Sequence, residues 1–386
     1  MVRIKIYTLL FGLCFTIQIA FSQSSLNLKQ IQKIELDKTD YIGGLPVKYE
    51  ISQDTVYYIV KMAGKITLYK KHVNDSISEV HQTVHSIPRL SFNTGFEIDI
   101  VNSKIYYLFS DGVIALPNRP KSVDFPSLDY LTNLDVIYYD ISMQSNLLVM
   151  NSCYNYATKD PDPAYCHYKV IDLEGNSVKT AKLKHDAIGF THLPSYFINT
   201  GFNLVALTNA LSNKIEIYDI TNDSSIITGN LNLINNEIDS LPFNTKIGPY
   251  TNAKGVLMNV SDFGKSIDRF EGCFVLNRET IGVVLKTKGN NINSKRLLYI
   301  YSKDEYGNWG HTKTFKYKNN LYSKKYGLFQ FYYPSGIKVI DENKISIVEF
   351  NIPNYVNSKL GLLRFKRNMS MDEPLKQAIY VYEIIY

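Results

Sequence analysis

Hydrophobic and polar residues alternate with a period of two along most of this chain, and short polar turns separate the alternating runs. The clearest example is Gly95–Pro117, where apolar residues alternate with Glu97 and Asp99 before a polar break at Asn102–Ser103. A period of two places successive side chains on opposite faces of a β-strand. The segment therefore predicts three consecutive antiparallel strands, and Asp111–Gly112 is expected to supply the positive φ angles of a two-residue hairpin loop.

The same order of strands and turns recurs along the chain. The further copies are Val47–Tyr69, Val136–Val178, Phe202–Ile227, Cys273–Trp309 and Gly336–Lys366. Together these are six copies of roughly 60 residues each, a length that suits four-stranded antiparallel units with variable loops. No long run has a sustained helical period of apolar residues, so the pattern predicts an all-β protein.

Two segments fit this repeat poorly. They are Gly229–Phe270, with one good strand at Val256–Val260, and Tyr317–Tyr333, which is rich in Lys and Tyr. We expect both segments to contribute outer strands and surface loops.

Three of the copies share a polar turn, then Lys-Ile, then an alternating strand. The sequences are NSKIYYL at 102–108, SNKIEIYDI at 212–220 and ENKISIVEF at 342–350. This pattern resembles the blades of six-bladed β-propellers of the TolB-like and NHL-like group. The resemblance implies a single β-propeller domain over residues 23–386, built from six blades of four-stranded antiparallel meanders. Seven blades would fit the same pattern.

Both ends of the chain carry a strand pattern. The chain ends in Ala378–Tyr386, which is apolar and aromatic, and the first strand after the N-terminal leader is Ile31–Leu36. An exposed terminal strand invites aggregation, whereas pairing strands from both ends within a ring would remove the free edges. We therefore expect these two strands to lie in the same blade or in adjacent blades.

Residues 1–22 have the features of a signal peptide. Arg3 and Lys5 precede an apolar run that ends at Phe21, and a small residue suits cleavage before Gln23. A membrane anchor is the alternative, but the run is shorter than the ~20 apolar residues that span a bilayer. The leader resembles those of Bacteroidetes bacteria. We expect a protein exported to the periplasm or out of the cell.

The charge of the chain limits its partners. The formal net charge is +6, and removal of the leader with its two basic residues lowers it to +4. Because the basic residues are scattered and form no long run, the sequence argues against a nucleic-acid partner. The chain is too polar to cross a membrane several times, so we expect no integral membrane span in the mature protein.

Three cysteines remain after the leader. Cys153 and Cys166 flank a polar loop, and each lies at the end of a strand-like run. Antiparallel pairing of these runs would bring the two thiols together, and an exported protein meets an oxidising compartment, so we predict a disulfide between them. The alternative is a pair of buried thiols. Cys273 is expected to be a buried apolar residue.

No motif for catalysis, metal binding or cofactor binding fits its requirements. HQTVH at 81–85 has the spacing of a zinc-protease motif, but Gln82 replaces the Glu that acts as the base, and a strand would hold the two His too far apart. FGKS at 263–266 lacks the glycine that begins a phosphate-binding loop. Asp160 and Asp162 provide fewer oxygen ligands than a calcium ion requires. We therefore expect no metal and no cofactor.

The first functional hypothesis is an exported binding or interaction module without catalytic activity. Aromatic and polar residues in predicted connections are candidates for a ligand site, because aromatic rings stack on sugars and anchor protein interfaces. The candidates are His192, Tyr196, Tyr306 and Trp309. The expected ligand is a protein or a carbohydrate at one face of the propeller.

The second hypothesis is a polysaccharide lyase or glycoside hydrolase that acts at the central funnel. Some propeller lyases use His, Tyr and Arg around that funnel. The residues of this kind in or near predicted connections are His85, Arg89, His192, Tyr196 and Arg278. The enzyme hypothesis predicts that His and Tyr side chains converge within hydrogen-bonding reach at one mouth.

Overall fold

The computed structural model describes more than half of the chain. The described residues are 26–27, 29–37, 48–62, 64–88, 91, 93–138, 140–152, 165–184, 196–209, 214–221, 227–232, 269–286, 296–317, 326–327, 337–353 and 376–385. The leader, Val256–Val260 and the expected last strand of the copy at Gly336–Lys366 lie outside these residues.

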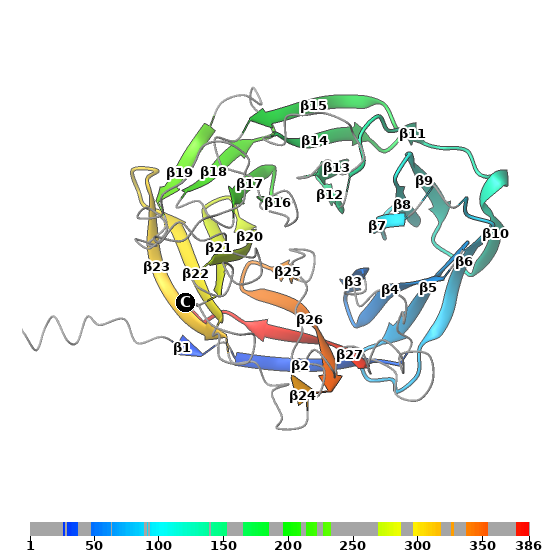
Figure 1. Cartoon of the computed structure of the whole chain (residues 1–386), viewed down its shortest axis with the longest axis horizontal. Helices are drawn as coiled ribbons and strands as arrows, with labels where there is room; N and C mark the ends of the chain where they lie inside the picture. The colour runs from blue at the N-terminus through cyan, green and yellow to red at the C-terminus, as the bar shows by residue number, and fades with distance from the viewer. Residues whose placement is uncertain are drawn as a thin grey trace, which may run out of the picture.

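The strands form a β-propeller, in which antiparallel sheets stand side by side around an axis (Figure 1). Five sheets consist mainly of strands that follow one another along the chain. The first contains β3 (Lys48–Ser52), β4 (Thr55–Met62), β5 (Lys65–His72) and β6 (Glu79–His85). The second contains β7 (Asn93–Asp99), β8 (Lys104–Phe109), β9 (Gly112–Pro117) and the short β11 (Thr132–Asn133).

The next three sheets repeat this order. The third contains β12 (Asp140–Gln144), β13 (Leu147–Ser152), β14 (Tyr165–Asp172) and β15 (Ser177–Lys184). The fourth contains β16 (Tyr196–Gly201), β17 (Leu204–Asn209), β18 (Lys214–Asp219) and β19 (Ile227–Asn232). The fifth contains β20 (Arg269–Asn277), β21 (Thr280–Lys286), β22 (Arg296–Lys303) and β23 (Trp309–Tyr317).

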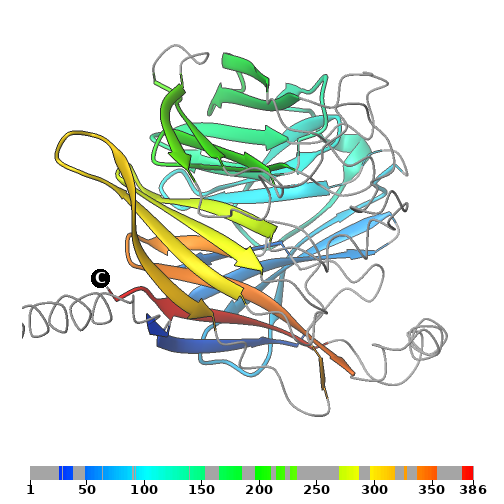
Figure 2. The same ribbon diagram turned by 60° about the vertical axis from the view of Figure 1, so that its left-hand side comes forward.

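A composite sheet contains strands from both ends of the chain. It contains β25 (Ile337–Asp341), β26 (Lys344–Pro353), β27 (Lys376–Glu383) and β2 (Lys29–Leu36), and the short β24 (Tyr326–Gly327) pairs with the end of β26. β2 and β27 are antiparallel, with Ile34 opposite Ile379. Figure 2 shows them side by side, β2 in dark blue and β27 in red. The predicted pairing of the two chain ends is confirmed.

Two sheets carry an additional outer strand that runs parallel to its neighbour. β10 (Lys121–Asp124) leaves the second sheet and pairs with β6 of the first. β1 (Leu26–Asn27) pairs with β23 of the fifth sheet before the chain enters the composite sheet. These strands cover edges that would otherwise be open to other chains, and they tie neighbouring sheets together.

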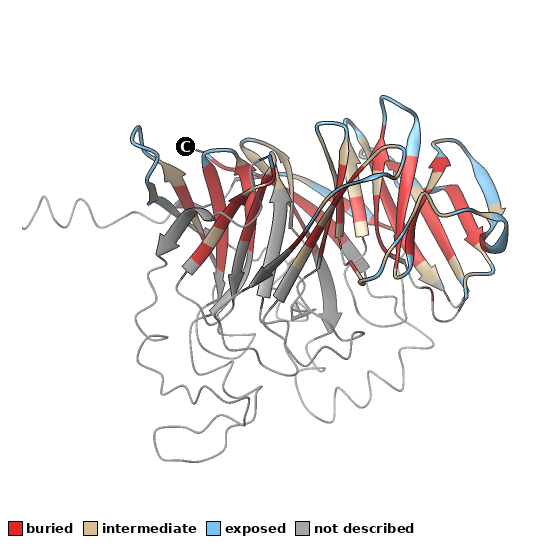
Figure 3. Ribbon diagram, turned by 90° about the horizontal axis from the view of Figure 1, so that it is seen from above, coloured by how far each residue is buried: buried red, intermediate tan, exposed pale blue. Residues whose placement is uncertain are grey.

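The hydrophobic core lies between the sheets, because both faces of each sheet pack against a neighbour. Successive residues of one strand therefore enter different clusters: Tyr106 packs with Ile141 of the third sheet, whereas Tyr107 packs with Ile66 of the first. β8 is consequently buried along nearly its whole length. Asp99, in an apparently polar alternation, is fully buried and bonds to Asn102 through both carboxylate oxygens. Figure 3 shows that exposed residues concentrate in turns.

The predicted role of Asp111–Gly112 is wrong, because Gly112 does not have a positive φ angle. A Cβ atom at Gly112 would lie 2.2 Å from the Tyr130 ring, so the glycine provides room for this tyrosine. The left-handed residue of this sheet is Ser103, with φ of 52°, in the turn predicted at Asn102–Ser103. Among the residues described, none of the helices is both long and apolar enough to cross a membrane.

Candidate functional site

Charged side chains extend from the innermost strands of four sheets. These strands are β3, β7, β12 and β25, which lie nearest the middle of the ring in Figure 1. We call the five residues the axial cluster: Lys48, Glu50, Glu97, Asp140 and Lys338. All five are half-buried.

Two ion pairs connect these strands. Lys48 Nζ lies 3.7 Å from Asp140 Oδ1, although their strands belong to the first and third sheets and the second sheet stands between them. This pair therefore joins two sheets that are not neighbours in the ring. Lys338 of the composite sheet pairs with Glu50 of the first sheet, and its ammonium group also lies 5.9 Å from the ring centroid of Tyr49.

Glu97 is an acid of this cluster whose ionised form is disfavoured by burial. Its carboxylate accepts backbone N–H hydrogen bonds from Ile98 at 3.1 Å and from Met143 of the third sheet at 3.2 Å. Burial, together with the negative charges of Asp140 and Asp99, nevertheless raises the pKa of Glu97 to about 8. At neutral pH this side chain is mostly protonated and can donate a hydrogen bond.

The pKa of Lys338 shifts in the opposite direction from that of Glu97. Burial and the positive charge of Lys48 lower the pKa of Lys338 to about 7, although the Glu50 carboxylate stands beside its ammonium group. The axial cluster therefore presents carboxylates, ammonium groups and a protonated acid together near pH 7. Such a mixture can bind a polar ligand by hydrogen bonds without a strong preference for either sign of charge.

Sequence reasoning did not select the axial cluster. The sequence feature that could have indicated it is the alternation of polar residues in the first strand of a copy. Examples are Lys48 and Glu50, or Glu97 and Asp99. That alternation is typical of a strand with one face in solvent. It does not distinguish solvent from the inside of a ring, because the distinction depends on which strand of each sheet lies innermost.

The structure places two of the predicted ligand residues at the β22–β23 hairpin. Tyr306 is 81% exposed at its turn, and Trp309 begins β23 and packs against the core between the fourth and fifth sheets. The Lys303 ammonium group lies 5.2 Å from the Trp309 ring centroid. Trp309 thus has a packing role, and Tyr306 is the accessible member of the pair.

The other two predicted ligand residues are described less fully. His192 lies outside the described residues, and Tyr196 begins β16 without a described side chain. The predicted partners in the disulfide are similar: Cys153 lies outside the described residues, and Cys166 belongs to β14. Cys273 is buried between the fourth and fifth sheets, as predicted.

The described histidines lie on third and fourth strands of their sheets, away from the axial cluster. His81 and His85 are on β6, as expected for a strand, and they bond to Asn118 at 2.8 Å and Ser122 at 3.0 Å. His311 lies on β23 between tyrosine rings. Within the described part of the chain, no group of acidic, His or Cys residues has metal-binding geometry.

Of the residues named for the enzyme hypothesis, Arg278 lies in the β20–β21 turn and bonds to Asp219 at 2.8 Å. His85 is on β6, distant in the fold from that turn. Arg89 lies outside the described residues. The described members of this set therefore do not converge.

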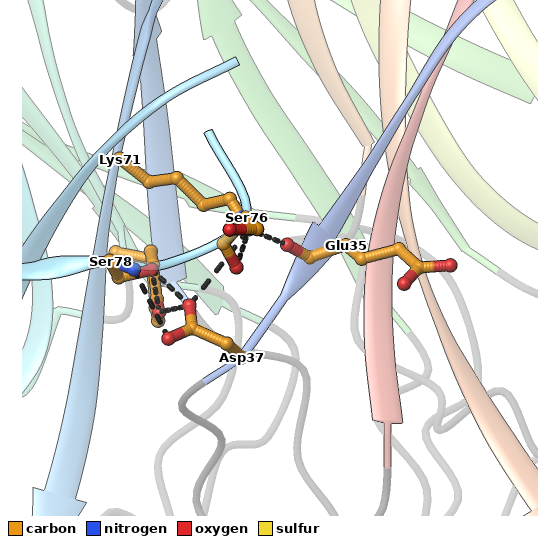
Figure 4. A network of polar contacts seen from close by, with 6 residues as sticks. Glu35, Asp37, Lys71, Ser76 and Ser78 are labelled. Carbon is orange, nitrogen blue, oxygen red and sulfur yellow. Dashed lines mark hydrogen bonds and ion pairs between the residues drawn. The ribbon is translucent and has the colours of Figure 1, made fainter. Parts of the chain in front are cut away.

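A second polar network joins the composite sheet to the first sheet (Figure 4). Asp37, directly after β2, accepts hydrogen bonds from the Ser78 backbone at 3.1 Å and from Tyr58 Oη at 3.2 Å, and it also accepts one from the Ser78 hydroxyl. The buried Lys71 donates to the backbone oxygen of Glu35 at 2.5 Å. The network fixes the end of β2 to the β5–β6 hairpin and has a structural role.

Known proteins resemble this chain in fold only. No protein-family model matches the chain, and no curated protein matches it. The WD40 domain of Toxoplasma gondii coronin is similar in structure, with 8% identity and a TM-score of 0.46 over 94% of this chain and 87% of that one. A Bacteroides fragilis NCTC 9343 protein whose name marks it as exported has 11% identity and a TM-score of 0.46 over 94% and 97%. Neither similarity indicates a function.

Proposed function

We propose that this protein is an exported binding module without catalytic activity, and that it binds a carbohydrate at the axial cluster. The observation that carries this proposal is the ion pair between Lys48 and Asp140, whose sheets are not neighbours in the ring. Such side chains from separate sheets can contact one ligand together. Sugar hydroxyls both donate and accept hydrogen bonds, and the cluster offers both kinds of partner near pH 7.

Affinity electrophoresis and calorimetry with soluble neutral and acidic polysaccharides test the proposal. We expect at least one polysaccharide to bind, and we expect the Lys48→Gln variant to weaken that binding by about tenfold, the loss of one charge-assisted hydrogen bond. Asp129→Asn, an exposed change far from β3 and β12 in the fold, is the control. Absence of binding to the whole panel, or equal binding by the Lys48 variant, would contradict the proposal.

A propeller-type lyase or hydrolase is the alternative function, and it makes a different prediction for the same polysaccharides. A lyase would release unsaturated uronates that absorb in the ultraviolet, and a hydrolase would release reducing ends. The binding proposal predicts neither product after prolonged incubation with the polysaccharide that binds best.

We also propose that the composite sheet is the sixth blade of a ring related to the TolB-like and NHL-like group. The support is its position between the fifth and first sheets. Ile345 of this sheet packs with Phe274 of the fifth, and Val381 packs with Tyr58 of the first. The resemblance of the leader to Bacteroidetes leaders supports export to the periplasm or the cell exterior. A measurement of the intact mass should show that the exported protein begins at Gln23.

The proposed disulfide rests on strand register. Ser152 of β13 pairs with His167 of β14, and the next residues of the two strands are Cys153 and Cys166. Alkylation without reductant should leave both cysteines unmodified, while Cys273, buried in the native state, should react once the protein is unfolded. Two free thiols at positions 153 and 166 would contradict the pairing.

A further inference from the structure

One end of the propeller carries two sets of turns, those between the first and second strands of each sheet and those between the third and fourth. Backbone hydrogen bonds join the two sets in five sheets. They run from Val73 to Asp54, Asn118 to Ser103, Ile220 to Asn203, Lys303 to Glu279 and Ile384 to Asn343, at 2.7–2.9 Å. We call these turns, with the chain end at Ile384–Ile385, the turn face. Figure 3 shows exposed turns along one side of the ring.

Every sheet places an exposed large apolar side chain on the turn face or directly beside it. In sheet order these are Ile77 (69% exposed), Val101 (89%), Val178 (56%), Phe202 (41%), Tyr306 (81%) and Ile385 (51%). Single exposed apolar residues are ordinary on protein surfaces. Their recurrence at the same end of all these sheets is not explained by the packing of any one sheet.

The turn face is also acidic. Its exposed acidic residues in the described turns are Asp54, Asp75, Glu174, Glu279, Asp304, Glu305 and Glu342. The basic residues in those turns are Arg119 and Arg278. The strand residues that flank the turns contribute five lysines and six acidic residues, so they do not reverse the balance. The chain as a whole has a formal net charge of +6, so this face is opposite in sign to the molecule.

We propose that the turn face docks a protein segment that combines lysine or arginine with large apolar residues. Apolar tips between acidic turns are complementary to such a segment in both charge and hydrophobicity. An anionic membrane would be repelled by the acidic turns. A second copy of the protein that used the same face would bring like charges together.

The docking site lies apart from the ion pair between Lys48 and Asp140 in the axial cluster. Lys48 and Asp140 are the first residues of β3 and β12, whereas the turn face follows the last residues of these strands. The inference therefore goes beyond the proposed carbohydrate site, and substitutions at one site should leave the other unaffected.

The single tryptophan of the chain provides the readout, because Trp309 directly follows the turn that carries Tyr306. The probe is a synthetic peptide of alternating Lys and Leu, added to the full-length mature protein while Trp309 fluorescence is recorded. We expect saturable binding that weakens as salt is raised, since salt screens exposed charges. A peptide of alternating Glu and Leu should not bind.

Variants separate the two features of the face. The double variant Val101→Ser with Tyr306→Ser keeps every charge and should weaken Lys-Leu binding at least about fivefold through lost apolar contact. Asp75→Asn with Glu342→Gln keeps the apolar tips and should reduce the salt dependence. Asp124→Asn, an exposed change at the end of β10 that lies away from the turn face, and Lys48→Gln in the axial cluster should bind the peptide as the original protein does.

Several outcomes would overturn the proposal. They are equal binding of the Glu-Leu and Lys-Leu peptides, unchanged binding by both double variants, or an equal loss of binding by Asp124→Asn. Binding to phosphatidylglycerol vesicles that the Val101 and Tyr306 changes abolish would assign the face to a lipid surface. Self-association that the same changes abolish would assign it to a second copy.

Discussion

Glu97 shows how an ordinary polar position in a strand changes its chemistry inside a ring. Its raised pKa of about 8 means that the folded state holds a proton that the unfolded state releases near pH 4.5. Folding therefore becomes less favourable as the pH rises above 4.5 toward 8. Lys338, with its lowered pKa of about 7, has the opposite effect above pH 7 because its folded state loses a proton first.

The Glu97→Gln variant should remove the stability loss between pH 5 and pH 7. Glutamine does not titrate, but its amide nitrogen cannot accept one of the two backbone N–H bonds, so the variant loses a constant amount of stability. Relative to the original protein, its free energy of unfolding should rise with pH by at most about 1.4 kcal/mol per unit. Urea unfolding at several pH values measures this difference. Glu305→Gln, an exposed change in a turn, is the matched control. An equal pH dependence in the Glu97 variant and the original protein would contradict the assigned ionisation.

A comparison of Gly175 with Gly307 distinguishes the cost of backbone strain from the cost of a packing clash. Both occupy the fourth position of an Asp-x-x-Gly-Asn turn that begins at Asp172 or Asp304, with φ of 92° and 82°. A Cβ at Gly175 would lie 2.2 Å from the Leu131 backbone oxygen, whereas a Cβ at Gly307 would have no heavy atom within 4 Å.

We expect Gly307→Ala to cost about 1 kcal/mol of unfolding free energy, from the left-handed φ angle alone. Gly175→Ala should cost a further 1–3 kcal/mol or so, since the Leu131 backbone must move. Denaturant unfolding of the two variants gives the difference directly. Equal losses of unfolding free energy in the two variants would show that the Leu131 backbone moves without an energetic penalty.

At the scale of elements, the network around Asp37 joins β2 to the β5–β6 hairpin. Partial burial alone would raise the pKa of Asp37, but hydrogen bonds from Ser78 and the charge of Lys71 hold it below its usual value. The carboxylate therefore stabilises the fold at neutral pH, and this contribution is lost as the pH falls through the lowered pKa.

Asp37→Asn should destabilise the protein by about 1 kcal/mol at pH 7, because Lys71 and Ser78 lose a charged partner, and solvent screens that charge since Asp37 is only partly buried. The loss should shrink toward pH 3. Glu35→Gln is the control, since Lys71 binds the backbone oxygen of Glu35 and not its side chain (Figure 4). Thermal unfolding across this pH range compares the stability of the two variants. An equal effect of both changes would show that the network does not stabilise the fold.

At the scale of the whole molecule, β27 lies between β2 and β26 and closes the ring. Its side chains alternate between two cores: Tyr380 packs toward the fifth sheet, and Val381 packs toward the first. The strand therefore supports both of the sheets that flank the composite sheet.

Deletion of Ile379–Tyr386 should lower the melting temperature of the whole domain by more than about 5 °C, because it exposes two cores and removes the pairing of the chain ends. A chain that ends after Ile384 is the control, as it keeps the bond from Ile384 to Asn343. A soluble deletion variant with an unchanged melting temperature would show that β27 is an appendage.

The sequence alone did not predict the parallel outer strands β1 and β10. It did predict the repeated antiparallel strands in the described parts of the copies and the pairing of the chain ends. These features follow from the period of two, from polar turns such as Asn102–Ser103, and from the need to cover apolar terminal strands. All are local in sequence or depend on edge protection, so composition and alternation are sufficient to predict them. The burial of Cys273 followed from its apolar neighbours in the same way.

Only the tertiary structure decided which polar residues face the ring axis, which apolar residues gather on one end, and why Gly112 is a glycine. Each depends on distance across sheets: Lys48 meets Asp140 from two sheets away, and Tyr130 fills the space that Gly112 leaves. Alternation assigns a residue to one face of its strand but not to a neighbour, because the neighbour is set by how the sheets stack around the axis.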